Sequence, residues 1–60
     1  MNKEILLEKI NSILLRINNA KLEAELISLE DDIDMEDDEL KLRILSNNLE
    51  SILARYNYKE

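Results

Sequence analysis

The sequence predicts an all-α protein, an antiparallel two-helix hairpin whose long helices span about residues 3–30 and 35–57. First, the chain contains no glycine and no proline, and Leu, Ile, Glu, Lys and Ala dominate it, which favours helix almost throughout. Second, leucine and isoleucine recur three and four residues apart on both sides of the middle of the chain. Third, eight of the ten residues at positions 30–39 are acidic, which is typical of a solvated turn between two helices.

The length of the chain limits its architecture. Sixty residues form one domain at most, spanning residues 1–60, and a chain of this size buries only about 60% of its unfolded surface. Disulfides and the usual zinc sites are excluded, because the sequence has no cysteine and no histidine. Close helix packing and oligomerisation therefore remain as sources of stability. The sequence shows no apolar run of about 18 residues and no secretory-signal pattern, so we expect a cytoplasmic protein without a membrane partner.

The net charge of −6 is concentrated in one place. Residues 1–29 carry equal numbers of acidic and basic side chains, residues 30–39 are strongly acidic, and residues 40–60 are slightly basic. Phosphate binding requires clustered Lys and Arg, so we expect no nucleic-acid partner.

Two apolar series share the predicted first helix. The first series consists of Leu6, Ile10, Ile13, Ile17, Ala20, Ala24 and Ile27. The second series has the same alternating spacing, offset by two positions, and consists of Leu15, Asn19, Leu22, Leu26, Leu29 and Ile33. One partner helix cannot cover both series.

Three interpretations of these series remain open. The first is one wide apolar face in a small bundle, and the second is a helix with two faces, one for the hairpin and one for another chain. The third is a break at Asn18 and Asn19, which would produce three short helices, because asparagine tolerates the left-handed conformation. Asn19 is either a seam residue that sets the helix register or an exposed polar residue.

The acidic residues 30–39 divide into two groups by their expected position. Asp34 is the predicted N-cap of the second helix, and the acidic residues that follow Met35 complement the positive end of its dipole. Acidic residues before this point lie at the C-terminal end of the first helix, where negative charge is unfavourable. The whole segment is either a solubilising turn or a contact surface for a basic partner. Such a contact surface could imitate the phosphates of a nucleic acid. As a contact surface it would use Glu30, Asp31, Asp32, Asp37 and Asp38.

The residues of this segment exclude an EF-hand calcium site and leave only non-specific screening by divalent cations. Asp32, Asp34 and Glu36 match the first three ligand positions of an EF-hand loop. The loop then requires glycine at its sixth position and glutamate at its twelfth, where this chain has Asp37 and Arg43. We therefore expect no metal.

The predicted second helix has one apolar face for the hairpin, solvent-facing charge outside this face, and additional apolar residues beside it. The apolar face consists of Leu42, Leu45, Leu49, Ile52 and Tyr56, and the solvent-facing charges are Lys41, Arg43 and Arg55. Leu40 and Ile44 lie off the main face, near the acidic segment, and would extend the second series into an exposed apolar patch. Such patches usually mark interaction sites. We expect two hairpins to associate into a four-helix bundle, a homodimer. The face available to a second copy or another protein would comprise Leu15, Leu22, Leu26, Leu29, Leu40 and Ile44.

Two stretches of the second helix are similar to known families. Residues 45–50, Leu-Ser-Asn-Asn-Leu-Glu, resemble the second-helix motif of the small aspartyl-phosphate phosphatases that regulate sporulation, although Asn47 and Asn48 depart from it. The resemblance implies that Ser46 and Glu50 meet the phosphoaspartate of a response regulator. Residues 53–56, Leu-Ala-Arg-Tyr, are similar to a stretch of the plasmid repressor-of-primer proteins, which are helical hairpins that dimerise into four-helix bundles.

These observations favour a binding function over catalysis. The sequence has no histidine or cysteine for acid–base or nucleophilic chemistry and no glycine-rich phosphate loop, so we expect neither an enzyme nor a cofactor. The predicted function is a small protein-binding regulator or inhibitor, encoded by a phage or plasmid, that acts through its surplus apolar face and its acidic turn. The alternatives are a structural dimerisation module and a phosphatase-like regulator of a bacterial response regulator.

Overall fold

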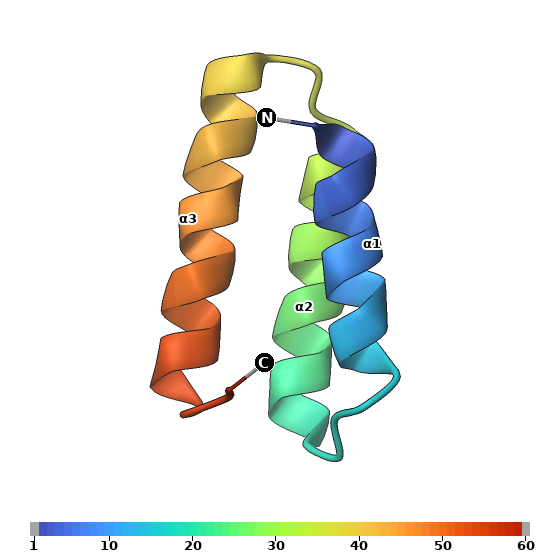
Figure 1. The fold of residues 1–60 in the computed structure, drawn as a ribbon, viewed down its shortest axis with the longest axis vertical. Coiled ribbons are helices and arrows are strands. Elements are labelled where there is room, and N and C mark those ends of the chain that lie inside the picture. Colours follow the sequence, from blue (N-terminus) through green and yellow to red (C-terminus); the bar gives the residue numbers. More distant parts are fainter. Residues whose placement is uncertain (1, 60) are drawn as a thin grey trace.

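The computed structural model describes residues 2–59, and within them the chain forms three α-helices: α1 (Lys3–Leu14), α2 (Ala20–Asp34) and α3 (Glu39–Arg55). Helices α1 and α3 run in the same direction, and α2 runs in the opposite direction and packs against both (Figure 1). The bundle measures 31 × 18 × 17 Å. The prediction of an all-α protein is confirmed. The structure differs from the predicted hairpin because the long first helix is replaced by two helices and a loop at residues 15–19.

Each helix begins at a side chain that caps its first turn. Asn2 precedes α1, Asn19 precedes α2 and Asp38 precedes α3. In each case the side-chain oxygen accepts hydrogen bonds from the backbone N–H groups two and three residues further on, which otherwise lack partners inside the helix. Asp34, the predicted N-cap of the last helix, is instead the last residue of α2. Asn19 is an N-cap, which neither of the two sequence interpretations of this residue had assigned.

The loop at residues 15–19 explains the two apolar series. In α1 the first series faces inward, with Leu6, Ile10 and Ile13 buried. After the loop, Ala24 and Ile27 of that series are exposed and the second series is buried instead. The offset of two positions therefore marks the point where one helix ends and the next begins at a different rotation. The break at Asn18 and Asn19, one of the three interpretations that the sequence left open, is the arrangement found.

The core consists of aliphatic side chains from all three helices. Eleven hydrophobic residues are buried among those described, and no buried polar or charged side chain accompanies them. The buried hydrophobic residues are Leu6, Ile10, Ile13, Leu22, Leu26, Leu29, Ile33, Leu42, Leu49, Ile52 and Leu53. Half-buried Tyr56 and Tyr58 pack against the cluster at the end of α3. Three short helices thus cover most of their apolar surface within one chain.

The end of α3 is held by a Schellman motif. Asn57 has a φ of 56°, in the left-handed region where asparagine is the best tolerated residue after glycine. The N–H of Tyr58 donates to the carbonyl oxygen of Leu53 over 2.9 Å, and the N–H of Asn57 donates to that of Ala54 over 3.1 Å. This turn directs Tyr58 back onto the core.

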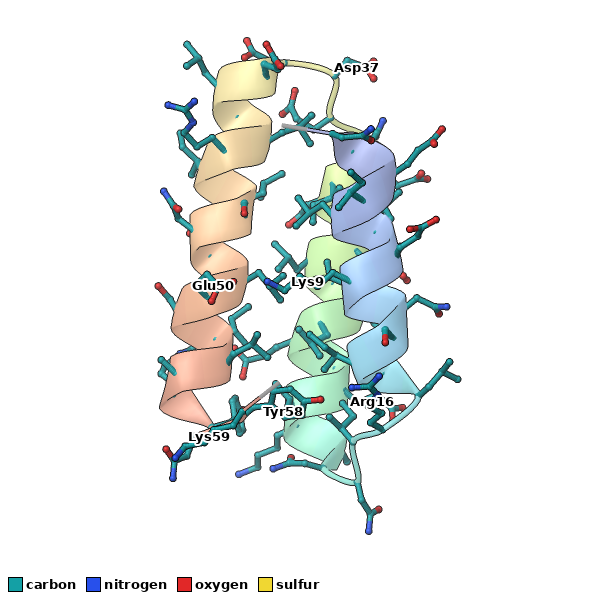
Figure 2. All side chains as sticks on the ribbon, in the orientation of Figure 1. Lys9, Arg16, Asp37, Glu50, Tyr58 and Lys59 are labelled. Atoms are coloured by element: carbon teal, nitrogen blue, oxygen red, sulfur yellow. The ribbon has the colours of Figure 1, made fainter. Side chains whose placement is uncertain are left out.

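Helices α1 and α3 are linked by charge in the middle of the bundle. The Lys9 Nζ lies 2.9 Å from the Glu50 Oε1, and the Lys9 side chain extends from α1 toward Glu50 on α3 (Figure 2). Ion pairs this exposed contribute little to stability, typically about 0–1 kcal/mol. Within residues 2–59, no helix has the length and apolar character that a membrane span requires.

Candidate functional site

One end of the bundle, which we call the acidic end, is formed by residues 30–39. The N-termini of α1 and α3 and the C-terminus of α2 meet there (Figure 1). Helix N-termini carry partial positive charge, so Glu4 in α1 and Glu39 in α3 lie where a carboxylate is favourable. The final residues of α2 are acidic although its C-terminus carries partial negative charge. The positive N-termini of α1 and α3 lie at the same end of the bundle and reduce this cost, whereas the predicted hairpin had only the N-terminus of its second helix there.

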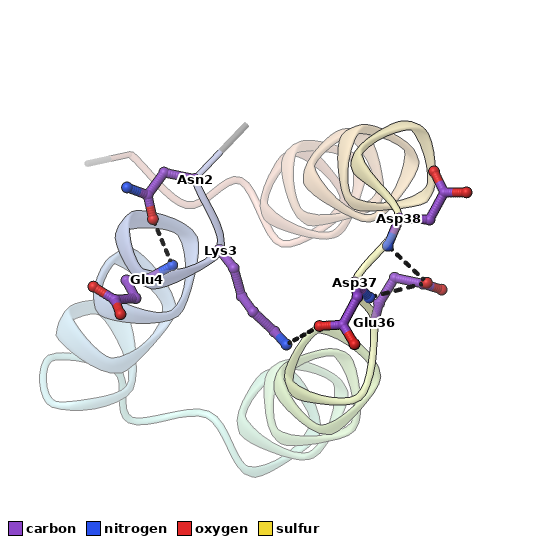
Figure 3. A network of polar contacts seen from close by, with 6 residues as sticks. All are labelled: Asn2, Lys3, Glu4, Glu36, Asp37 and Asp38. Carbon is purple, nitrogen blue, oxygen red and sulfur yellow. Dashed lines mark hydrogen bonds and ion pairs between the residues drawn. The ribbon is translucent and has the colours of Figure 1, made fainter.

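Three acidic residues of the connecting loop are occupied by contacts within the chain. The Glu36 carboxylate accepts hydrogen bonds of 3.2 Å from the backbone N–H groups of Asp37 and Asp38 (Figure 3). The Asp37 carboxylate lies 3.2 Å from the Lys3 Nζ, which ties the start of α1 to the loop. Asp38 caps α3. Part of the acidic segment is therefore structural.

The remaining carboxylates of α2 point to two different sides. Half-buried Glu30, with Asp31 and Asp34, lines a shallow hollow beside Leu7 of α1. Asp32 lies on the other side, facing α3. The five acidic residues predicted as one contact surface are thus brought to the same end of the bundle but not to one face, and Asp32 is the member that borders the groove described next.

An open groove follows the seam between α2 and α3 on the side away from α1. Its half nearer the acidic end has a volume of about 390 Å³ and is mainly apolar. This half is lined by Asp32, Met35, Glu36, Lys41, Ile44 and Leu45. The other half has a volume of about 360 Å³, and polar residues border much of it. That half is lined by Glu25, Ser28, Leu29, Asp32, Asn48, Ser51, Ile52 and Arg55. Asp32 borders both halves, so we treat them as one feature, the α2–α3 groove.

Large apolar side chains are exposed around the apolar half of this groove. Met35 is 84% exposed and Ile44 is 58% exposed. Leu40 is 70% exposed and lies one turn before Ile44 on the same face of α3, although it does not line the groove itself. An apolar cluster of this kind, rimmed by charge, is the usual appearance of a protein-interaction site.

The structure separates the residues of the predicted apolar contact face. Leu22, Leu26 and Leu29 are buried in the core, so the chain itself covers them and they do not form an outer face. Leu15 is 81% exposed, but it lies in the loop at the opposite end of the bundle. From this face, Leu40 and Ile44 remain together and exposed.

The polar half of the groove contains a small hydrogen-bonded cluster that joins α2 to α3. The Tyr56 hydroxyl donates to the Glu25 carboxylate, and the Arg55 Nη2 lies 2.7 Å from the Glu25 Oε1. The hydrogen bond from Tyr56 lowers the pKa of Glu25, and the guanidinium of Arg55 lowers it further. The same hydrogen bond raises the pKa of Tyr56. Glu25 is therefore already paired and adds little net charge to this half.

The residues singled out by the family resemblances lie elsewhere or are already engaged. Glu50 accepts the hydrogen bond from Lys9 on the α1 side of α3, and Ser46 is half-buried. Leu53 is in the core. Arg55 and Tyr56 bind Glu25.

Several residues of the groove were not predicted as site residues. Met35 was assigned to the start of a helix, although an exposed methionine inside an acidic segment is a visible signal for a contact residue. Leu45 was assigned to the hairpin face, and it is half-buried at the base of the groove. Lys41 was treated as solvent-facing charge, and it lines the groove.

The chemistry of the groove suits binding. Its lining consists of aliphatic side chains, a thioether, hydroxyls, an amide, carboxylates and two cations, in a groove that is open to solvent. No group of three or more acidic side chains in residues 2–59 is placed to hold a metal ion. Comparisons of the chain with protein families, with curated proteins and with solved structures find no match. We therefore infer a function from the geometry and charge of the groove itself.

Proposed function

We propose that this chain is a small non-enzymatic protein that regulates or inhibits a larger protein by binding an apolar, positively charged part of it in the α2–α3 groove. The observation that carries the proposal is the exposure of Met35, Leu40 and Ile44 beside the acidic end. Fully burying a large apolar side chain contributes about 1.5–3 kcal/mol, so covering three of them supplies about 4.5–9 kcal/mol toward the cost of association. A cytoplasmic setting, and a phage or plasmid origin, belong to the same proposal.

Charge favours a basic protein over a second copy of this chain. Two acidic groups, Asp32 and Glu36, and one basic group, Lys41, border the apolar half of the groove, and the whole chain carries a net charge of −6. A symmetric dimer centred on the apolar half would bring two acidic ends together, and like charges disfavour such contacts. A basic partner would instead be attracted, and its association would weaken as salt is added. The homodimer of the sequence analysis, and a purely structural module built on it, form the competing proposal.

Capture experiments with matched variants test the function. The immobilised chain, its Ile44→Ser variant and its Leu15→Ser variant are incubated with bacterial lysate, and bound proteins are quantified by mass spectrometry. Leu15 is the control because it is equally apolar and more exposed, but lies at the far end of the bundle. We expect a protein retained by the wild type and by Leu15→Ser to be lost with Ile44→Ser, and its activity to change when the wild-type chain is added. Equal retention by all three chains would refute the proposal.

Sedimentation velocity distinguishes the homodimer proposal from binding of a different protein. A chain that remains a 7.1 kDa monomer at micromolar concentration is expected here. A dimer that dissociates upon Ile44→Ser substitution would show that the groove binds a second copy and not a different protein.

A further inference from the structure

The length of the α2–α3 groove limits what can occupy it. Its lining residues run from Glu25 on α2 to Glu36 in the loop that follows this helix, and from Lys41 to Arg55 on α3. At a rise of 1.5 Å per residue these stretches are roughly 16 and 21 Å long. A helix of about 11–14 residues has the same length. The occupant is therefore a segment of about three or four helical turns and not a whole domain face.

The backbone of the groove selects a helix over an extended strand. Both walls are α-helices, whose N–H and C=O groups are engaged within the helix, so a strand would find no free sheet edge to pair with. The α2–α3 pair already holds one helix, because α1 packs on its other side. A segment in the groove would pack on the pair as a fourth helix, with its apolar residues three and four positions apart.

The distribution of charge indicates how that helix must be patterned. At the acidic end the groove is lined by Asp32, Glu36 and Lys41, a net negative set in which the Glu36 carboxylate already accepts two backbone hydrogen bonds, so Asp32 is the carboxylate left for an occupant. At the other end, Glu25 is held by Arg55 and Tyr56, and the remaining polar lining consists of neutral hydroxyl and amide groups. The negative charge that an occupant would meet is thus concentrated where the apolar side chains are.

We propose that the α2–α3 groove binds a short amphipathic helix of a partner protein, whose apolar face covers Met35, Ile44 and Leu45 and whose lysine or arginine residues lie toward Asp32 at the acidic end. This inference rests on the proposed function and specifies the partner's binding segment. The chain and the segment together form a four-helix bundle with one helix supplied by the partner.

Synthetic peptides test the pattern directly. The first is a fluorescein-labelled 14-residue peptide with leucines at helical spacing and three lysines at one end. The second has glutamates in place of the lysines, and the third has the composition of the first with its leucine spacing scrambled. Binding is measured by fluorescence anisotropy, and the helix content of the peptide by circular dichroism. We expect the first peptide to bind and become helical, and the other two to bind at least about tenfold more weakly.

Protein variants locate the peptide in the groove. Ile44→Ser is expected to weaken binding of the first peptide by about tenfold or more, which corresponds to losing one buried apolar side chain. Asp32→Asn is expected to weaken it about three- to fivefold, the effect of one exposed ion pair. Asp31→Asn removes the same charge from the side facing α1 and should change affinity less than twofold. Circular dichroism of each variant confirms its helix content, and all three positions are exposed.

The outcomes separate this inference from the proposed function. Equal binding of the charge-reversed or scrambled peptide, or equal effects of Asp31→Asn and Asp32→Asn, would overturn the inference. If no peptide binds while a captured protein still depends on Ile44, the proposed function stands and the helical-segment inference fails. Self-association through Ile44 that is tighter than peptide binding would overturn both.

Discussion

Replacing Asn19 by alanine should lower the stability of the protein if the first helix is broken at this position, and should raise it if the helix is continuous. In the structure the Asn19 side chain accepts hydrogen bonds from the N–H groups of Lys21 and Leu22 at 3.0 and 3.1 Å. Alanine removes both bonds, and loss of an asparagine N-cap typically costs about 1 kcal/mol, within a range of about 0.5–2. In a continuous helix the same substitution would place the best helix former at an interior position and stabilise the protein by roughly 0.5 kcal/mol.

The expected loss is large enough to measure in a chain of this size. Sixty residues have a total stability of roughly 3–9 kcal/mol. A change of about 1 kcal/mol lowers the melting temperature of such a domain by roughly 4–8 °C. Urea denaturation followed by circular dichroism at 222 nm gives the change in the free energy of unfolding. Measurement at two protein concentrations detects any contribution from association.

Two control substitutions complete this test. Asn18→Ala changes an exposed residue of the same loop and should alter stability by less than about 0.5 kcal/mol. Asn19→Asp keeps a side-chain acceptor at the start of α2 and should preserve stability. An Asn19→Ala protein that is more stable than the wild type would refute the break at this position, and with it the three-helix arrangement.

The core and the cluster in the polar half of the groove supply two further predictions. Leu26→Ala removes a fully buried side chain of α2 from the core and should lower the free energy of unfolding by about 2.7–5 kcal/mol. Leu40→Ala at an exposed site should lower it by less than about 0.5 kcal/mol, and urea denaturation measures both changes. Similar losses for the two variants would show that Leu40 is covered. Because the pKa of Glu25 is lowered in the folded state, its stabilisation is present above the unfolded carboxyl pKa of about 4.3 and is lost as pH falls through the folded value. Tyr56→Phe removes the largest cause of that shift, so the stability difference between wild type and variant should shrink from pH 7 to pH 3, and a constant difference would contradict it.

The structural role of some residues could be predicted from the sequence, and that of others could not. Leu49 and Ile52 lie on the face that the spacing predicted for packing, and both are buried. Asn19 could not be assigned from spacing, since an asparagine between two apolar series suits a seam, an exposed site and a cap equally well. Its backbone, with φ −141° and ψ 109°, settles that it is a cap. The change of apolar series at residues 15–19 was visible, but a change of face occurs both in a broken helix and in a helix with two partners.

The residues of the candidate site were predicted in part, for a similar reason. Leu40, Ile44 and Asp32 were identified from the sequence because they depart from the main apolar face or lie in the acidic segment. Met35 and Glu36 were not, because their role depends on where α2 ends. In the structure α2 continues to Asp34, so Met35 is the C-cap of α2 and lines the apolar half of the groove. In the predicted hairpin, Met35 would instead be the first residue of the second helix.

The sequence by itself determined that this protein is helical, that its apolar residues repeat at helical spacing and that its negative charge lies in one segment. These properties are local: they depend on backbone preference, on side-chain period and on composition. Only the tertiary structure decided which apolar series is buried at each point and which carboxylates face the same side. The period of a helix specifies which residues share a face, but the rotation of that face changes wherever the helix breaks. Three short helices leave Met35, Leu40 and Ile44 outside the core and place Met35 and Ile44 in one groove with Asp32.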